Sequence, residues 1–391
     1  MAIEGRSDAK QGGRIRLGMV GGGQGAFIGA VHRLAARMDD QYEFVAGALS
    51  SSPERSKASG AELGLAPDRI YTDYREMAKA ESKRKDGIEA VAIVTPNNIH
   101  VPAAKAFVDA GIHVICDKPL ALSLKEAKSL ETLLKKKNVV FALTHNYSGY
   151  PMVRQAREMV AKGELGQIRL VQAEYPQDWL TEDIEKSGQK QAAWRTDPKQ
   201  SGGGAIGDIG THAYQLACFV SGLALDELAA DMTSFVKGRK VDDNVNVMLR
   251  FKNGARGMLW ASQVAPGNEN GMRLRVYGTK GGLEWTQVDP NYLWFTPFGH
   301  EKRLITRGGA GSGAAAGRVT RVPPGHPEGY LEGFANIYSE AARAIIARRS
   351  GKKADKDVMF PGIEDGVAGM AFIEACVKSS AKNSKWTKVA A

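Results

Sequence analysis

Short apolar runs alternate with helix-period segments along the first third of the chain. Runs of β-branched and other apolar residues predict strands at 15–20, 42–48, 90–95, 113–117 and 139–144. Apolar residues at helical spacing predict helices at about 26–38, 53–63, 99–110 and 123–136. Near-continuous apolar strands joined by helices are typical of a parallel sheet that helices cover on both faces, with right-handed crossovers.

The pattern changes after about residue 147, where predicted strands follow one another directly and apolar and polar residues alternate. Such strands are predicted at 168–175, 244–251, 255–264 and 273–278, and FKNGA at 251–255 carries an Asn-Gly hairpin signal. We therefore predict an α/β protein with an N-terminal Rossmann dinucleotide-binding domain followed by an α+β domain with a large, mostly antiparallel open sheet. The predicted boundaries are a flexible tail at 1–13, the first domain at 14–146 and the second at 147–391, with a flexible surface loop at 307–317.

Composition narrows the class of protein. A chain of 391 residues with 43% hydrophobic content is long enough for two ordinary domains. No run approaches the roughly 18 to 20 apolar residues that span a bilayer, and the N-terminus lacks an apolar signal region, so we expect a cytoplasmic protein with no membrane partner. The three cysteines lack metal-ligand spacing, which predicts no metal site. The net charge of +10 is spread among acidic residues, so we expect small anionic ligands and no nucleic-acid partner.

A glycine cluster, VGGGQGAFIGAVH at 20–32, follows the first predicted strand and opens the first predicted helix. At this place a dinucleotide pyrophosphate meets backbone N–H groups and the helix N-terminus. A G-x-G-x-x-G/A register with a small third residue gives the candidate cofactor residues Gly21, Gly23, Gln24 and Ala26. A second register, which uses Gly29, stays open, as does a glycine-rich turn that binds no nucleotide.

The residues after the second predicted strand bear on the choice of cofactor. Such folds usually carry an acid there for the ribose hydroxyls, whereas ALSSSPER at 48–55 has a serine at position 50. A 2′-phosphate is then not repelled, and Ser50, Ser51 and Arg55 are its candidate ligands. The pattern favours NADP over NAD and leaves NAD open, because Arg55 is equally well explained as a solvated helix residue.

Several motifs in fixed order carry a resemblance to a known family. They are TPNNIH at 95–100, CDKP at 116–119, THNY at 144–147, the segment GGGAIGDIGTHAYQL, and a predicted C-terminal helix that ends in EACVKSSAKNSKWTKV at 374–389. With the glycine loop, they resemble the glucose-fructose oxidoreductase / inositol dehydrogenase (Gfo/Idh/MocA) family. The likeness covers nearly the whole chain.

This resemblance implies that Lys118 lies beside the nicotinamide and the reacting hydroxyl. Oxidation of a secondary alcohol requires a base or proton relay. A lysine is cationic near pH 7 unless its surroundings lower its pKa, so Lys118 acts either as a shifted base or as a stabiliser of alkoxide charge. Asp117 replaces the family's glutamate, and we expect its contacts to need a shifted backbone or a water. The resemblance also implies a cis bond between Lys118 and Pro119.

Asp208 and His212 match the family's Asp-x-x-x-His pattern at the start of a predicted helix, where a spacing of four places both on one face. His212 can pass a proton, and Asp208 can orient a second hydroxyl. An N-cap role for Asp208 and a packed helix position for His212 are the simpler alternatives. Other residues assigned to the cofactor are Thr95, Asn97, His100, Asp117 and Lys118. Substrate candidates, for which ordinary packing is an equal alternative, are Tyr147, Arg154, Trp194 and Arg195.

We therefore predict an NAD(P)-dependent dehydrogenase that transfers hydride between nicotinamide and a hydroxyl of a sugar, inositol or related polyol. A redox-neutral enzyme with tightly bound NAD(P) and a non-catalytic NAD(P)-binding sensor are the alternatives. Apolar residues on both faces of the second predicted sheet predict a homodimer or homotetramer, unless they pack on the domain's own helices; they are Val245, Met248, Leu259 and Trp260.

Overall fold

The computed structural model describes residues 13–390, so nearly all of the predicted tail lies outside it. Contacts divide the chain into two compact units, and each is described by itself. The first runs to Ala121 and includes Lys125–Gly149 and Tyr330–Val367. Leu122–Leu124, Tyr150–Gly329 and the chain from Ala368 form the second.

The first unit contains a five-stranded parallel sheet with the order β2-β1-β3-β4-β5, which confirms the predicted Rossmann-like arrangement. Its strands are β1 (Ile15–Gly21), β2 (Tyr42–Ala48), β3 (Ala90–Val94), β4 (His113–Cys116) and β5 (Phe141–Leu143). The helices between and after them are α1 (Phe27–Met38), α2 (Pro53–Glu62), α3 (Tyr74–Glu81), α4 (Asn97–Asp109), α5 (Leu124–Leu134) and α11 (Tyr330–Arg349), with short 3-10 turns η3 (Pro67–Arg69) and η4 (Asn146–Gly149). Helix α3 was not predicted from the sequence; it begins where Asp73 caps the N–H groups of Arg75 and Glu76.

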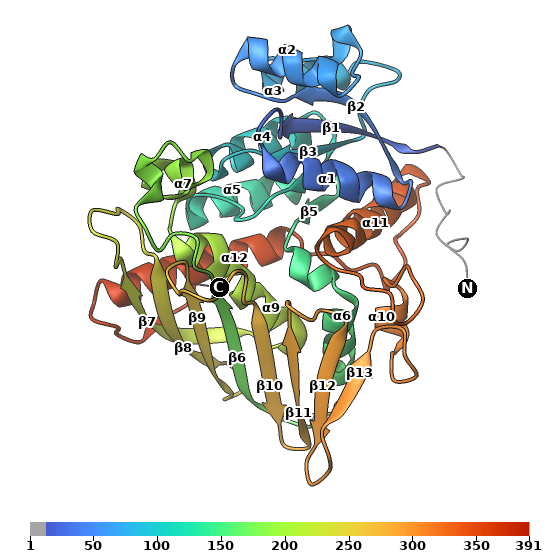
Figure 1. Cartoon of the computed structure of the whole chain (residues 1–391). Helices are drawn as coiled ribbons and strands as arrows, with labels where there is room; N and C mark the ends of the chain where they lie inside the picture. Colours follow the sequence, from blue (N-terminus) through green and yellow to red (C-terminus); the bar gives the residue numbers. More distant parts are fainter. Residues whose placement is uncertain (1–12, 391) are drawn as a thin grey trace. The chain divides into compact units, whose positions relative to one another are not determined.

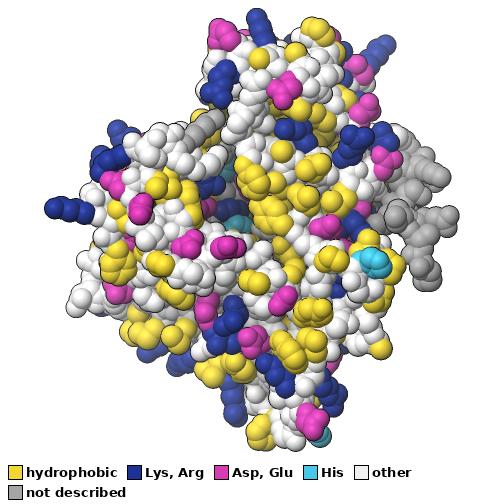
Figure 2. Space-filling view, viewed as in Figure 1, with side chains coloured by type: hydrophobic (Ala, Val, Ile, Leu, Met, Phe, Trp, Pro, Cys, Tyr) yellow, Lys and Arg dark blue, Asp and Glu magenta, His cyan; other side chains and the backbone are white. Residues whose placement is uncertain are grey.

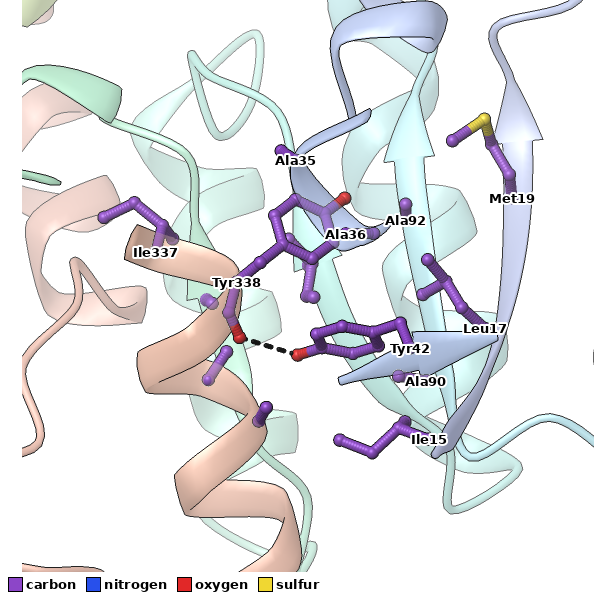
Figure 3. Packing of buried hydrophobic residues seen from close by; sticks show 14 of the residues in the cluster. Ile15, Leu17, Met19, Ala35, Ala36, Tyr42, Ala90, Ala92, Ile337 and Tyr338 are labelled. Carbon is purple, nitrogen blue, oxygen red and sulfur yellow. Dashed lines mark hydrogen bonds between the residues drawn. The ribbon is translucent and has the colours of Figure 1, made fainter. Parts of the chain in front are cut away.

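Helix α11 completes the hydrophobic core of the first unit, although it lies far along the sequence (Figure 1). Figure 3 shows Tyr338 of α11 beside Tyr42, whose hydroxyl donates to the Tyr338 carbonyl over 2.9 Å. The Tyr338 hydroxyl lies 2.8 Å from Nδ1 of His32 on α1. Contacts thus group Tyr330–Val367 with the first unit, whereas the sequence analysis places these residues in the second domain. The apolar face of α11 does not reveal which sheet it will cover.

The second unit is built on a nine-stranded sheet with the order β13-β12-β11-β10-β6-β9-β8-β7-β14. All its pairs are antiparallel except β6 with β9, which agrees with the predicted, mostly antiparallel sheet. The strands are β6 (Ile168–Pro176), β7 (Leu225–Thr233), β8 (Asn244–Phe251), β9 (Arg256–Ser262), β10 (Arg273–Gly278), β11 (Gly281–Thr286), β12 (Tyr292–Pro297), β13 (Arg303–Thr306) and β14 (Thr387–Lys388). The helices are α6 (Pro151–Ala161), η5 (Ile184–Lys186), α7 (Lys190–Arg195), α8 (Pro198–Ser201), the π-helix η6 (Ile206–Gly210), α9 (Thr211–Ser221), α10 (Ala314–Gly317) and most of α12 (Ile363–Ser380), whose start up to Val367 belongs to the first unit. Helix α9 packs on β6, β9 and β10, and α6 packs on α9 (Figure 1).

Two predicted elements of the second domain are corrected. The C-terminal helix ends at Ser380 instead of continuing to 389, because Asn383 and Ser384 adopt positive φ angles of 51° and 56°, and the chain then adds β14 to the sheet. The glycine-rich stretch 307–317 was predicted to be a flexible surface loop, but it contains α10, which packs against α6. Arg307 is buried and donates to the carbonyls of Val322 and Pro323, which ties this segment down.

Charged side chains of both signs are interspersed on the face of the molecule shown in Figure 2. Arg84, for example, pairs with both Asp68 and Asp86. Within residues 13–390, none of the helices has the length and apolar content needed to cross a membrane.

Candidate dinucleotide site and catalytic residues

The glycine loop joins β1 to α1 and brings two glycines into close backbone contact. A Cβ on Gly29 would lie 2.4 Å from the Cα and carbonyl oxygen of Gly22, so the start of α1 can pack this closely only with glycine at position 29. Nη1 of Arg33 donates to the same Gly22 carbonyl over 2.8 Å. Gly29 therefore supplies the tight helix packing that the third position of the fingerprint requires, as in the second register. Ala26, the third position of the first register, is the half-buried N-cap.

The N-terminus of α1 fits an anionic pyrophosphate. In this part of the structure, α1 has neither a side-chain cap nor an acidic residue in its first turn. The partial positive charge of the helix end is therefore not neutralised by the helix's own side chains. Backbone N–H groups and this helix end are the parts of the fold that hold a dinucleotide. The residues present at this loop thus fit the cofactor.

Arg55 of α2, the helix that follows β2, contacts the glycine loop. Its Nη2 donates to the carbonyl of Gln24 over 3.1 Å, and its side chain is exposed. Ser50 accepts from the N–H of Ser52, which also caps α2. Glu54 directly precedes Arg55 in the sequence. Hydrogen bonds from the N–H of Glu54 and from the Ser52 hydroxyl lower the pKa of the Glu54 carboxyl. The predicted phosphate ligands therefore lie near the exposed carboxylate of Glu54, and the exposed Glu62 accepts from the side chain of Gln24 over 2.8 Å.

Asp117 and Lys118 directly follow β4. Oδ1 of Asp117 accepts from the N–H of Lys118 over 2.8 Å and from the hydroxyl of Thr144 over 2.9 Å. The shorter aspartate thus makes these two contacts directly, so the expected bridging water is not needed for them. The Lys118–Pro119 bond is cis, as the resemblance implies. Sequence reasoning missed the contact of Thr144, although the residue lies in the THNY motif.

Two buried histidines, His100 and His145, lie close to the residues that follow β3 and β4. His100 places Nδ1 2.7 Å from the Pro119 carbonyl and Nε2 2.9 Å from the Thr95 carbonyl, which ties the two strand ends together. Burial lowers the pKa of His100 in spite of these acceptors. Burial and the charge of Lys118 lower the pKa of His145 to about 3. His145 was not identified from the sequence.

Several candidates of the first unit lie at one edge of its sheet. The glycine loop follows β1, Thr95 and the buried Asn97 follow β3, and Lys118 follows β4. The carboxyl ends of parallel strands meet at one edge, where open α/β sheets bind their ligands. The topology thus collects the predicted cofactor residues of β1, β3 and β4, although they are spread over about a hundred positions.

In the second unit, Asp208 lies in the π-helix η6 and His212 in the first turn of α9. Oδ2 of Asp208 lies 3.3 Å from Nε of Arg195 and 2.9 Å from Nε2 of Gln263. The N-cap of η6 is Ala205, so the alternative role of Asp208 as an N-cap is wrong. His212 is buried, and its ring packs against Tyr175.

Asp242 holds the glycine-rich segment that leads into this helix. Its carboxylate accepts from the N–H groups of Gly204 and Ile206 over 2.9 and 2.7 Å, and its carbonyl accepts from that of Ala205 over 2.8 Å. A Cβ on Gly204 would lie 1.7 Å from the Asp242 carbonyl oxygen. Burial raises the pKa of Asp242. Neither Asp242 nor Gln263 was identified from the sequence, because both lie outside the motifs.

The four predicted substrate residues differ in their surroundings. Tyr147 and Arg154 are 2% and 3% exposed, and the guanidinium of Arg154 lies 5.7 Å from the ring centre of Phe219. Trp194 and Arg195 are half-buried at the end of α7, with the Arg195 guanidinium 4.3 Å from the Trp194 ring centre. A substrate role for these four residues stays a prediction.

A Rossmann-like unit with a glycine loop, joined to a unit with a large open sheet, defines a class of two-domain, dinucleotide-dependent oxidoreductases. The chain belongs to the Gfo/Idh/MocA family. Residues 15–145 match the oxidoreductase family model with an NAD-binding Rossmann fold, and residues 153–284 match the GFO/IDH/MocA C-terminal domain. The predicted family and fold are thereby confirmed.

Three relatives resemble the chain over nearly its full length. An oxidoreductase from Sinorhizobium meliloti is 62% identical, with a TM-score of 0.88, and the match covers 96% of this chain and 99% of that one. An inositol dehydrogenase homolog from Azotobacter vinelandii, complexed with NADH and myo-inositol, is 35% identical, with a TM-score of 0.90 and coverage of 96% and 98%. Levoglucosan dehydrogenase from Pseudarthrobacter phenanthrenivorans is 29% identical, with coverage of 96% and 98%.

Proposed function

We propose that this protein is an NAD(P)-dependent dehydrogenase that oxidises a secondary hydroxyl of a sugar, inositol or related polyol. The observation that carries the proposal is the shared strand-end edge of the first unit, where the glycine loop and the Asp117–Lys118 pair follow β1 and β4. Relatives named for levoglucosan and complexed with myo-inositol support this substrate class. A secondary alcohol is common to both compounds.

The glycine loop and the catalytic candidates have distinct roles in this reaction. The bound nicotinamide supplies the chemistry of hydride acceptance, and the glycine loop would hold its pyrophosphate. Lys118 takes up the hydroxyl proton or stabilises the charge on that oxygen, with the Asp117 carboxylate bonded to its backbone N–H. Asp208 accepts a hydrogen bond from a substrate hydroxyl, and His212 passes a proton.

We also propose that the enzyme prefers NADP to NAD. Ser50 stands where such folds usually have a carboxylate, and the exposed Arg55 is tied to the glycine loop through Gln24. The proposal predicts that Arg55→Ala lowers kcat/KM for NADP⁺ by roughly tenfold and leaves NAD⁺ within about twofold. Arg75→Ala, at an exposed arginine of α3, is the control. A fall of equal size for both cofactors would contradict the preference.

We further propose that the open face of the second unit's sheet joins copies into a homodimer or homotetramer. Val245 and Leu259 are buried within the unit, whereas Met248 and Met258, which pair across β8 and β9, are 53% and 59% exposed. Leu170 and Tyr277, which pair across β6 and β10, and Trp294 of β12 are further exposed apolar residues of this sheet. Exposed apolar side chains on an open sheet face are the basis of the proposed interface. Light scattering should report a smaller particle for Met248→Lys/Met258→Lys, and an unchanged mass would exclude this face.

The central test follows NADH and NADPH formation over a panel of sugars, inositols and sugar acids. We expect turnover on at least one of them, and loss of roughly a thousandfold or more of kcat in Lys118→Ala. Lys125→Ala, which removes an exposed lysine seven residues along the chain, is the matched control. Wild-type turnover in Lys118→Ala would refute the catalytic role. Cofactor binding without turnover on the panel would favour a sensor instead.

A further inference from the structure

The Asp208 carboxylate is held by donors from two separate parts of the second unit. Nε of Arg195, at the end of α7, lies 3.3 Å from Oδ2, and Nε2 of Gln263, just after β9, lies 2.9 Å from the same oxygen. Arg195 precedes Asp208 by 13 positions and Gln263 follows it by 55. Two donors on one oxygen fix the plane of a carboxylate far better than one does.

The guanidinium of Arg195 is itself held in place. It lies 4.3 Å from the ring centre of Trp194 and 6.0 Å from that of Trp179. Its Nη1 donates to the side-chain oxygen of Gln191, which also accepts from the indole N–H of Trp194 over 3.3 Å. A planar group against aromatic faces keeps one orientation, which a lysine ammonium would not do.

Gln263 is fixed by its backbone. The residue is 2% exposed, its N–H donates to the Asp243 carbonyl over 2.8 Å, and its own carbonyl accepts from the N–H of Leu180 over 3.0 Å. Asp243 is anchored in turn by Arg239, which also bonds to Glu185. The backbone of Gln263 is therefore fixed, and its side-chain amide reaches Asp208 from this fixed backbone position.

We propose that Arg195 and Gln263 are positioning residues that keep Asp208 ionised and correctly oriented for substrate. This inference rests on the proposed function of Asp208. Arg195 supplies a positive charge that favours the carboxylate form, and Gln263 supplies a neutral donor that sets its direction. Arg195 thus acts through Asp208 and differs from a residue that binds substrate directly.

The experiment measures kcat, KM and their pH profiles for Arg195→Gln, Arg195→Lys and Gln263→Glu, with Arg75→Gln as the exposed-arginine control. We expect Arg195→Gln to lower kcat/KM by roughly ten- to a hundredfold, with the acid limb of the profile moved to higher pH. Arg195→Lys, which keeps the charge, should restore the acid limb but recover kcat only in part. Gln263→Glu should lower kcat/KM by roughly tenfold or more, because a second carboxylate replaces the donor. Cofactor affinity should stay within about twofold in every variant, since the glycine loop is untouched.

A double-mutant cycle with Asp208→Asn separates the possible outcomes. If Arg195 acts through Asp208, Arg195→Gln should cost less than about threefold in the Asp208→Asn background. Full additivity, or an acid limb that stays at the wild-type pH in Arg195→Gln, would overturn the inference. Full turnover in Asp208→Asn would instead refute the proposed role of Asp208, and the positioning inference would fall with it. If Asp208→Asn is impaired while Arg195→Gln and Gln263→Glu keep wild-type kinetics, the positioning inference is refuted and the proposed role of Asp208 stands.

Discussion

The contact between Gly29 and Gly22 makes Gly29→Ala a sharp test of the glycine loop. In an unobstructed helix, alanine in place of glycine stabilises by about 1 kcal/mol. Here the added Cβ would lie 2.4 Å from two backbone atoms of Gly22, whereas ordinary contacts begin at 3.4 Å, so the helix and the loop must separate by about 1 Å. Overpacking of this kind costs about 1 to 3 kcal/mol. We therefore expect no gain in stability and a net loss of up to about 2 kcal/mol.

The same displacement should weaken the cofactor. Gly22 lies in the loop whose N–H groups would face the pyrophosphate, and its carbonyl is already held by Arg33. A shift of about 1 Å lengthens such hydrogen bonds beyond their useful range, so the dissociation constant for NAD(P)⁺ should rise by roughly tenfold or more. Fluorescence titration measures the dissociation constant, and thermal unfolding with and without cofactor measures the stability.

Gly317→Ala is the matched control, because a Cβ at this helical position meets nothing within 4 Å. It should keep or slightly raise the unfolding temperature, because nothing obstructs the added Cβ, and it should leave cofactor binding close to that of the wild type. The reasoning is refuted if Gly29→Ala is as stable as the wild type and binds the cofactor equally well. Loss of stability with unchanged cofactor affinity would limit the role of the contact to packing.

Three further predictions follow from buried polar contacts. Thr144→Val should lower stability by about 1 kcal/mol and reduce kcat/KM, because Asp117 loses a donor; unchanged steady-state kinetics would exclude a role for that bond in turnover. Asp242→Asn removes a carboxylate whose pKa burial raises, so that in the wild type the folded state holds this proton more tightly than the unfolded state; urea stability of the variant relative to the wild type should therefore rise as pH increases above about 4, and a difference that does not change with pH would contradict the raised pKa. Acidification from pH 7.5 to 5.5 should lower the free energy of unfolding by about 1 kcal/mol for each histidine whose folded-state pKa lies well below 6.5, because only the unfolded state takes up the proton. His326→Gln should leave this loss of stability unchanged. These histidines are His32, His113 and His145. Burial is the main cause that lowers their pKa values, to about 4, about 4 and about 3 respectively.

The parallel sheet of the first unit was predictable because its strands are almost wholly apolar and because the glycine loop after its first strand has the pattern that binds a dinucleotide pyrophosphate. The strand AVAIV of β3 is buried at every position, so its sequence shows no alternation and indicates burial on both faces. The short helix α3 was missed because its eight residues are mostly polar. Its start depends on the Asp73 cap more than on an apolar stripe.

Long-range packing set the limit of prediction in both units. The apolar face of α11 is evident from its sequence, but its partner α1 lies about three hundred positions earlier. The glycine-rich stretch 307–317 looked unable to form a core, and it is ordered through the buried Arg307 and Glu328 pair. The spacing of apolar residues indicates that one face of an element is buried, but it does not indicate which other element that face packs against.

Long-range packing also explains which residues of each candidate site could be predicted from the sequence and which could not. Lys118 and Asp208 lie in short motifs, so they were found, whereas the groups that hold the two carboxylates lie elsewhere in the chain. Thr144 reaches Asp117 across 27 positions, and Gln263 reaches Asp208 across 55. A motif therefore marks the reacting group, while its orientation comes from neighbouring strands that only the sheet topology brings close. A substitution at Gln263 should for this reason change turnover while every recognisable motif stays intact.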